Sequence, residues 1–151
     1  MIIALCADSD YPINAFIEAY LTEQGHYLKK FGAFSSQKDE CWAEVGLEAA
    51  NAIYDGICDE GIFICWSGTG ISMAANKVTD VRAALCTDAR TAEAARVWNH
   101  ANVLALSQRL LTQDLAAEIL DAWFETPMDE RAEPAVIRLV QAENAYRHKS
   151  A

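Results

Sequence analysis

The sequence predicts an α/β fold, a three-layer α/β/α sandwich around a five-stranded parallel sheet of the Rossmann-like kind. Short apolar runs alternate with amphipathic segments at helical spacing along all 151 residues. Glycines close several of the amphipathic segments, and no internal repeat or linker interrupts the alternation. A chain of this length, 52% hydrophobic, fits one domain spanning residues 1–151.

The first half of the chain carries three predicted strands and two predicted helices. The apolar run 2–7 forms the first strand, and the following helix begins at Pro12 and ends at Gly25. A second strand at 26–31 leads into the polar loop 32–40. Apolar residues at helical spacing predict a helix at 42–54, which Gly56 closes. The wholly apolar run 62–65 is typical of a strand in the middle of a parallel sheet.

The second half continues the alternation. A glycine-containing turn at 66–70 joins the third strand to a helix that runs through residues 74–76. Further strands are predicted at 83–86 and 102–106, with helices at 88–97, at 112–124 after the N-cap Thr112, and at 134–148. Since ligands of such folds bind at the carboxyl ends of the strands, segments 7–11, 65–72, 87–90 and the loop near Ser107 are expected to carry the chemistry.

Composition excludes several classes of partner and cofactor. A formal charge of -10 opposes binding to nucleic acids and to anionic membranes. No apolar run approaches the roughly 20 residues of a membrane span. Five cysteines without a repeated C-x-x-C, and no basic leader, predict reduced thiols and a cytoplasmic protein. The three histidines lack metal-ligand spacing, so we expect no metal site and no cofactor.

The segment from Cys65 to Ser72 (CWSGTGIS) joins a buried strand to a helix. Gly68 and Gly70 allow the backbone to turn sharply and to present its N–H groups to an anion. Nearby hydroxyl groups, including that of Thr69, would complete an oxyanion or phosphate site. The pattern is not a dinucleotide fingerprint or a nucleotide P-loop, and by itself it is equally compatible with a tight turn that binds nothing.

Several sequence blocks, in their order and spacing, carry a resemblance. They are GIFIC at 61–65, SGTGISMAANK at 67–77, VRAALC at 81–86 and WNHANVL at 98–104. Over nearly its whole length the chain resembles the family of type B ribose-5-phosphate isomerases and galactose-6-phosphate isomerases. The resemblance implies an aldose–ketose isomerase that acts on a phosphorylated sugar through a cis-enediolate. By family, the reaction would interconvert ribose 5-phosphate and ribulose 5-phosphate.

The resemblance also implies roles for two residues at neighbouring strand ends. Cys65 would be the catalytic base, at the end of a strand facing a helix N-terminus, which favours the thiolate. The alternative is a buried core cysteine, which is common. Asp8 would bind a sugar hydroxyl and assist ring opening, whereas its structural alternative is to cap the loop before the first helix.

The remaining roles implied by the resemblance concern the anion and the partner subunit. Backbone N–H groups from Gly68 through Gly70 and Ile71 to Ser72 would stabilise the enediolate, and Ser67 or Thr69 would add a hydroxyl. The resemblance implies a homodimer or a dimer of dimers with shared active sites. In that assembly Asn99 would bind the neighbouring subunit's substrate, and Arg138 would hold the distal phosphate. A lone helical arginine is otherwise usually a solvated surface charge.

The chain departs from the family pattern at several polar positions. Ser9 stands where the family has a histidine, Trp98 replaces the histidine that opens the furanose ring, and Pro134 replaces a phosphate-binding arginine. Ser9 and Trp98 are still expected to border the substrate. For Trp98 the reason is that an indole face can pack on a sugar ring. Trp66 replaces the glycine that follows the catalytic cysteine, and an alternative alignment places Ser67 at the catalytic position.

These departures leave other functions open. A tetrose phosphate, which cannot close into a furanose, would need no ring-opening acid, so a tetrose, a hexose or an unphosphorylated sugar is an alternative substrate. A catalytically silent subunit that binds a sugar phosphate is a second possibility. A flavodoxin-like electron carrier agrees with the acidic charge but is disfavoured by the Ala-Ala-Asn-Lys helix after the glycine turn.

Overall fold

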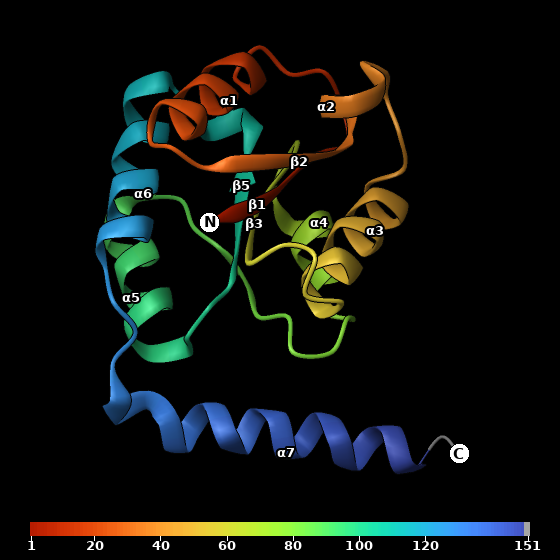
Figure 1. Cartoon of the computed structure of the whole chain (residues 1–151), viewed down its shortest axis with the longest axis vertical. Coiled ribbons are helices and arrows are strands. Elements are labelled where there is room, and N and C mark those ends of the chain that lie inside the picture. Colours follow the sequence, from red (N-terminus) through yellow and green to blue (C-terminus); the bar gives the residue numbers. More distant parts are fainter. Residues whose placement is uncertain (150–151) are drawn as a thin grey trace.

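Five parallel strands form one sheet in the computed structural model, which describes residues 1–149 (Figure 1). The strands are β1 (Ile2–Ala7), β2 (Tyr27–Gly32), β3 (Glu60–Cys65), β4 (Ala83–Leu85) and β5 (Val103–Ser107). Their order across the sheet is β2-β1-β3-β5-β4, and every pairing is parallel. The predicted five-stranded parallel sheet is therefore confirmed.

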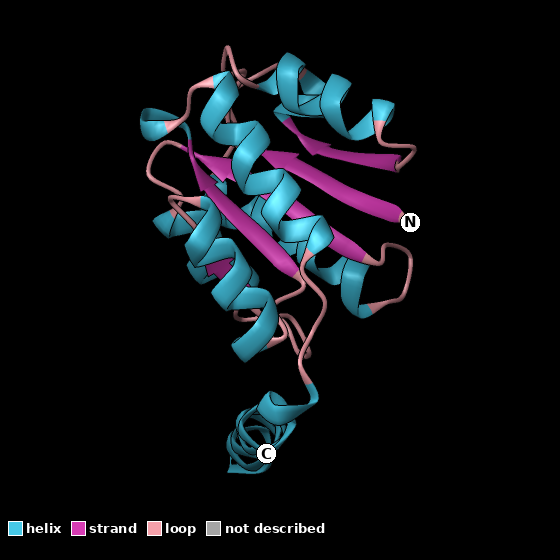
Figure 2. Cartoon of the chain, turned by 90° about the vertical axis from the view of Figure 1, so that its left-hand side faces the viewer, coloured by secondary structure: helices cyan, strands magenta, loops and turns pink. Residues whose placement is uncertain are grey.

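Helices cover both faces of this sheet. The α-helices are α1 (Asn14–Glu23), α2 (Ala33–Ser36), α3 (Trp42–Tyr54), α4 (Thr69–Ala75), α5 (Ala89–Asn99), α6 (Gln113–Glu125) and α7 (Glu133–Lys149), with short 3-10 turns η1 (Gln108–Leu110) and η2 (Glu130–Ala132). In Figures 1 and 2, α1, α5 and α6 lie on one face and α3 and α4 on the other. This is the three-layer sandwich that the alternation of elements predicts.

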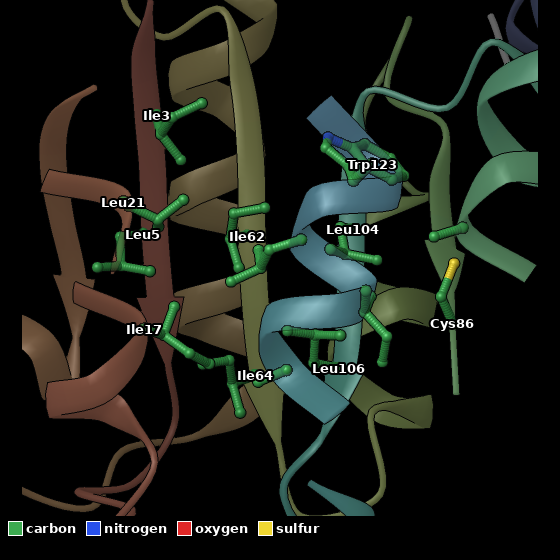
Figure 3. Packing of buried hydrophobic residues seen from close by; sticks show 14 of the residues in the cluster. Ile3, Leu5, Ile17, Leu21, Ile62, Ile64, Cys86, Leu104, Leu106 and Trp123 are labelled. Atoms are coloured by element: carbon green, nitrogen blue, oxygen red, sulfur yellow. The ribbon is translucent and has the colours of Figure 1, made fainter. Parts of the chain in front are cut away.

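The sheet is buried on both faces, as its apolar strands require. Along β3, Ile62 and Ile64 point into the core beneath α1 and α6, which Figure 3 shows together with Leu104, Leu106 and Trp123. The intervening Phe63 and Cys65 point to the opposite face and pack beneath α3 and α4. This alternation places the side chain of Cys65 on the α3 and α4 side of the sheet.

Strand β3 is longer than the predicted 62–65, and a buried ion pair lies at its first residue. The strand begins at Glu60, a charged residue that is 8% exposed. One carboxylate oxygen accepts a hydrogen bond from Arg96 Nη1 at 2.8 Å, and the other accepts one from Trp123 Nε1 at 2.8 Å. These bonds compensate the carboxylate for the loss of water, so a charge can lie inside the sheet.

Two other elements differ from the prediction. The polar loop predicted at 32–40 contains the short helix α2, which follows Gly32 at φ +58°. The last helix, α7, begins at Glu133 and extends away from the sandwich as an arm (Figures 1 and 2). A groove of about 740 Å³ lies between α7 on one side and β4 and α5 on the other.

Within residues 1–149, no helix combines the length and apolar character that a membrane crossing requires.

Candidate active site

The predicted site residues from two chain segments meet where β1 and β3 end. The strand order reverses between these two strands, which in open α/β sheets creates a crevice at the carboxyl edge. The amide of Asp8, directly after β1, donates to the carbonyl of Ile64 at 3.3 Å. Cys65, the last residue of β3, pairs in register with Ser107 at the end of β5. Asp8, Cys65 and Ser107 therefore lie at one edge of the sheet.

The turn after β3 is fixed by its glycine and by β5. Gly68 has a φ of +75°, and an added Cβ would lie 3.0 Å from the carbonyl carbon and oxygen of Leu106. The carbonyl of Trp66 accepts hydrogen bonds from the amide of Arg109 at 3.1 Å and from Ser107 Oγ at 3.2 Å. Only glycine fits position 68, and the turn is held against the end of β5.

The turn presents donors at the start of α4. Among the described residues, none accepts a hydrogen bond from the amides of residues 67–71, which include the predicted donor Gly68. The amide of Ser72 is already used, since it donates to the Gly68 carbonyl at 3.2 Å, so Ser72 could contribute only its hydroxyl to a ligand. Ser67 Oγ and Thr69 Oγ1 lie 2.7 Å apart and share a hydrogen bond. The free donors of the turn are therefore these five amides and one of the two paired hydroxyls, since the other hydroxyl donates to its neighbour.

Cys65 lies deep at the base of this turn. Its side chain is 4% exposed and belongs to the same buried cluster as Phe63 and the fully buried Ile71. A negative charge on Cys65 is among the causes that raise the pKa of Tyr11 and of Cys6, so the three groups are electrostatic neighbours. The next residue, Trp66, is 61% exposed and does not fill the interior beside the thiol.

The loop after β1 holds Asp8 in a defined environment. Tyr11 Oη donates to Asp8 Oδ1 at 2.8 Å. Burial raises the pKa of Asp8, while the hydrogen bond from Tyr11 acts in the opposite direction. The hydroxyl of Ser9 donates to Asp39 Oδ1, from the loop before α3. Tyr11 lies in the segment 7–11 that the sequence predicts to carry chemistry, but the sequence assigns it no role, and Asp39, in the polar loop 32–40, lies outside the predicted segments.

A tryptophan covers the turn from the α3 side. A Cβ added to Gly70 would lie 2.9 Å from the indole of Trp42, so any larger residue at position 70 would collide with the ring. Trp42 is the first residue of α3, and its side chain is 44% exposed. Its helical position is visible in the sequence, but its contact with a turn 28 residues later is not.

Three predicted substrate-binding residues lie elsewhere in the same chain. Trp98 and Asn99 end α5, which runs from the carboxyl edge back to the amino edge of the sheet, and both are exposed. The guanidinium of Arg131 lies 5.2 Å from the ring centroid of Trp98. Arg138 is exposed on the arm α7. Within one subunit these side chains do not join Cys65 and Asp8.

Neither of the histidines whose side chains the structure describes borders the turn. His26 precedes β2 and stacks on Phe124, with ring centroids 4.5 Å apart. His100 precedes β5, and its Nε2 lies 2.8 Å from the carbonyl of Asp129. Both histidines are therefore at the amino edge of the sheet. Among residues 1–149, no group of three or more His, Cys, Asp or Glu side chains is placed to hold a metal ion.

Comparison with known proteins agrees with this arrangement. Residues 2–139 match the family model described as Ribose/Galactose Isomerase. The D-erythrulose-4-phosphate isomerase of Pectobacterium atrosepticum is 32% identical over 149 residues, covering 97% of this chain and 98% of that protein. Ribose-5-phosphate isomerase B of Escherichia coli is 36% identical over 118 residues, or 78% of each chain. The structure of Clostridium thermocellum ribose-5-phosphate isomerase B superposes with a TM-score of 0.90 at 36% identity, covering 97% of this chain and 99% of that one. The chain belongs to the ribose/galactose isomerase family and is an aldose–ketose isomerase of sugar phosphates.

Proposed function

We propose that this isomerase acts on a four-carbon sugar phosphate and interconverts D-erythrose 4-phosphate and D-erythrulose 4-phosphate. The observation that carries the proposal is that Trp98 stands where the family pattern has the ring-opening histidine, while neither His26 nor His100 reaches the turn of its own subunit. Ser9, which stands at a position where the family pattern has a histidine, has its hydroxyl bonded to Asp39. The Pectobacterium relative, which matches along almost the whole chain, is named for a substrate of this size.

The chemistry of a tetrose phosphate agrees with such a site. A furanose ring forms when the hydroxyl on C4 attacks the aldehyde at C1. In a tetrose 4-phosphate that oxygen carries the phosphate, so the sugar stays open. An enzyme for this substrate needs a base and an oxyanion site, but no acid to open a ring.

The reaction then uses groups that meet at the end of β3. The Cys65 thiolate removes the proton from C2 of the aldose, and the C1 carbonyl oxygen becomes the enediolate oxygen. Amides of residues 69–71 donate to that oxygen as its charge grows. The thiol returns the proton to C1, while Asp8 carries the proton of the C2 hydroxyl to O1, which leaves the ketose.

Ribose 5-phosphate is the second candidate. It is supported by the 36% identity to the Escherichia coli enzyme and by the likeness to the Clostridium thermocellum structure. This substrate needs a ring-opening acid, and Asp8, whose pKa is raised by burial, is the carboxyl available at the turn.

The test is an isomerisation screen over tetrose, pentose and hexose phosphates, with the unphosphorylated sugars alongside. We expect the highest kcat/KM for the tetrose phosphates. A clear preference for ribose 5-phosphate would replace the first proposal by the second. Ligand-dependent rises in Tm without turnover of any sugar would instead identify a silent binding subunit.

We propose that the active unit is a dimer, in which a second copy covers α7. Ile137 and Leu139 on this arm are 52% and 57% exposed, and the adjoining groove is lined largely by apolar atoms of β4, α5 and α7. In this arrangement Asn99 and Arg138 would serve the partner's turn, as the family resemblance implies.

The five free cysteines agree with a reducing, cytoplasmic location.

Size-exclusion chromatography with light scattering tests the dimer. Ile137→Asp combined with Leu139→Asp should give a folded monomer with little activity, because each charge would have to be buried in the interface. Tyr27→Asp, at a residue 75% exposed on the edge strand β2, is the matched control and should leave the dimer intact. A dimer that survives the double substitution would contradict this arrangement.

A further inference from the structure

We infer that Tyr11 is a positioning residue for the isomerisation, which holds one oxygen of Asp8 so that the other can take a sugar hydroxyl. The inference rests on the proposed function of Asp8. It concerns a residue to which the sequence assigns no role, although Tyr11 lies in the expected segment 7–11, and whose hydroxyl the fold of the loop after β1 brings to Asp8.

The loop fixes the tyrosine in place. The amide of Tyr11 donates to the carbonyl of Ser9 at 3.0 Å, and the carbonyl of Tyr11 accepts from the amide of Asn14 at 3.0 Å. The buried side chain of Asn14 donates to the same Ser9 carbonyl at 3.0 Å. The tyrosine ring is half-buried against the core beneath α1 and α6. These hydrogen bonds hold the loop in the conformation in which the Tyr11 hydroxyl reaches Asp8.

Among the side chains that the structure describes, Tyr11 alone donates a hydrogen bond to Asp8. The hydroxyl reaches Oδ1 at 2.8 Å, and no side chain in the described part of the chain donates to Oδ2. Ser9, the nearest alternative donor in sequence, is engaged by Asp39. The two carboxylate oxygens of Asp8 are thus unlike: the Tyr11 hydroxyl holds Oδ1, and no described side chain competes with a ligand for Oδ2.

The charges around the pair determine its protonation. Burial and the charge of Asp39 both raise the pKa of Asp8, whereas the hydrogen bond from Tyr11 and, to a smaller extent, one from the backbone amide of Asp8 itself lower it. Burial, the hydrogen bond to Asp8 and the charges of Asp8, Cys65 and Asp39 raise the pKa of Tyr11, so its hydroxyl remains protonated and donates at neutral pH. Tyr11 therefore keeps Asp8 ionised at a lower pH than burial alone would allow.

The variant that tests this role is Tyr11→Phe, which keeps the ring and removes only the hydroxyl. Loss of a hydrogen bond to a charged group should lower kcat about tenfold or more, with KM changed by less than about threefold. The acid limb of the kcat profile should move to higher pH, because Asp8 then protonates more easily. Tyr20→Phe is the matched control: it also removes a tyrosine hydroxyl from an aspartate, Asp121, on α6 away from the site, and should leave both readouts unchanged.

A double-mutant cycle with Asp8→Asn separates this role from a structural one. If Tyr11 acts through Asp8, the double variant should be no slower than Asp8→Asn alone. Additive losses, or a Tyr11→Phe enzyme with wild-type kcat and pH profile, would overturn the inference. If the wild-type enzyme turns over no sugar, the proposed function fails instead. The inference is then tested by carbon-13 NMR titration of Asp8, whose pKa should rise in Tyr11→Phe; an unchanged pKa would overturn it.

Discussion

Replacement of Gly68 by alanine tests whether the turn after β3 is held in the conformation that exposes its amides. At φ +75° a residue with a Cβ costs about 1–2 kcal/mol relative to glycine. The new Cβ would also lie 2.4 Å from Leu85 Cδ1 and 3.0 Å from the backbone of Leu106, and such overpacking costs about 1–3 kcal/mol. We expect Gly68→Ala to lower the free energy of unfolding by about 2–5 kcal/mol.

Gly25→Ala is the matched control, because this glycine has a similar φ of +81° but nothing lies within 4 Å of an added Cβ. Strain alone should then cost about 1–2 kcal/mol. Urea unfolding followed by circular dichroism measures both variants, and isomerase assays of the folded fraction compare their kcat. Equal losses of stability in the two variants would refute the packing argument. A folded Gly68→Ala with wild-type kcat would refute the role of the turn in catalysis.

Two further predictions concern the core. Arg96→Met leaves the buried carboxylate of Glu60 without its cation and should lower the free energy of unfolding, measured in urea, by about 3–5 kcal/mol. Lys30→Met, in an exposed ion pair, should lower it by about 1 kcal/mol or less. Equal losses in the two variants would contradict the stabilising role of the buried pair. Burial raises the pKa of the Cys86 thiol to about 12, so at pH 8 a thiol reagent should label the exposed Cys41 promptly and Cys86 only on unfolding. Mass spectrometry of the labelled peptides measures both rates. Prompt labelling of Cys86 in the folded protein would contradict this prediction.

The sheet could be predicted because its strands are apolar on both faces. The segments at 2–7 and 102–106 become β1 and β5 with shifts of about one residue at their ends, since hydrophobic periodicity alone determines them. Glu60 shows the limit of this reasoning. A charged residue normally ends a predicted strand, and only the distant Arg96 and Trp123 make its burial favourable.

The site was predictable where it is contiguous in sequence and unpredictable where it depends on the fold. The turn from Cys65 to Ser72 is one segment, so its glycines and hydroxyls can be identified directly. The bond from Tyr11 to Asp8 and the contact of Trp42 with Gly70 depend on how the chain folds, and neither follows from a local pattern. The structure also assigns the amide of Ser72 to a helical bond, which the sequence could not show.

The central claim is that Cys65 moves a proton between C1 and C2 of the sugar. Deuterium uptake from heavy water tests it most directly, with D-erythrulose 4-phosphate as substrate and mass spectrometry of the aldose product. We predict deuterium at C2 with the wild-type enzyme and almost none with a Cys65→Ala variant that remains folded by circular dichroism. Uptake at the wild-type rate in a folded Cys65→Ala variant would contradict the account.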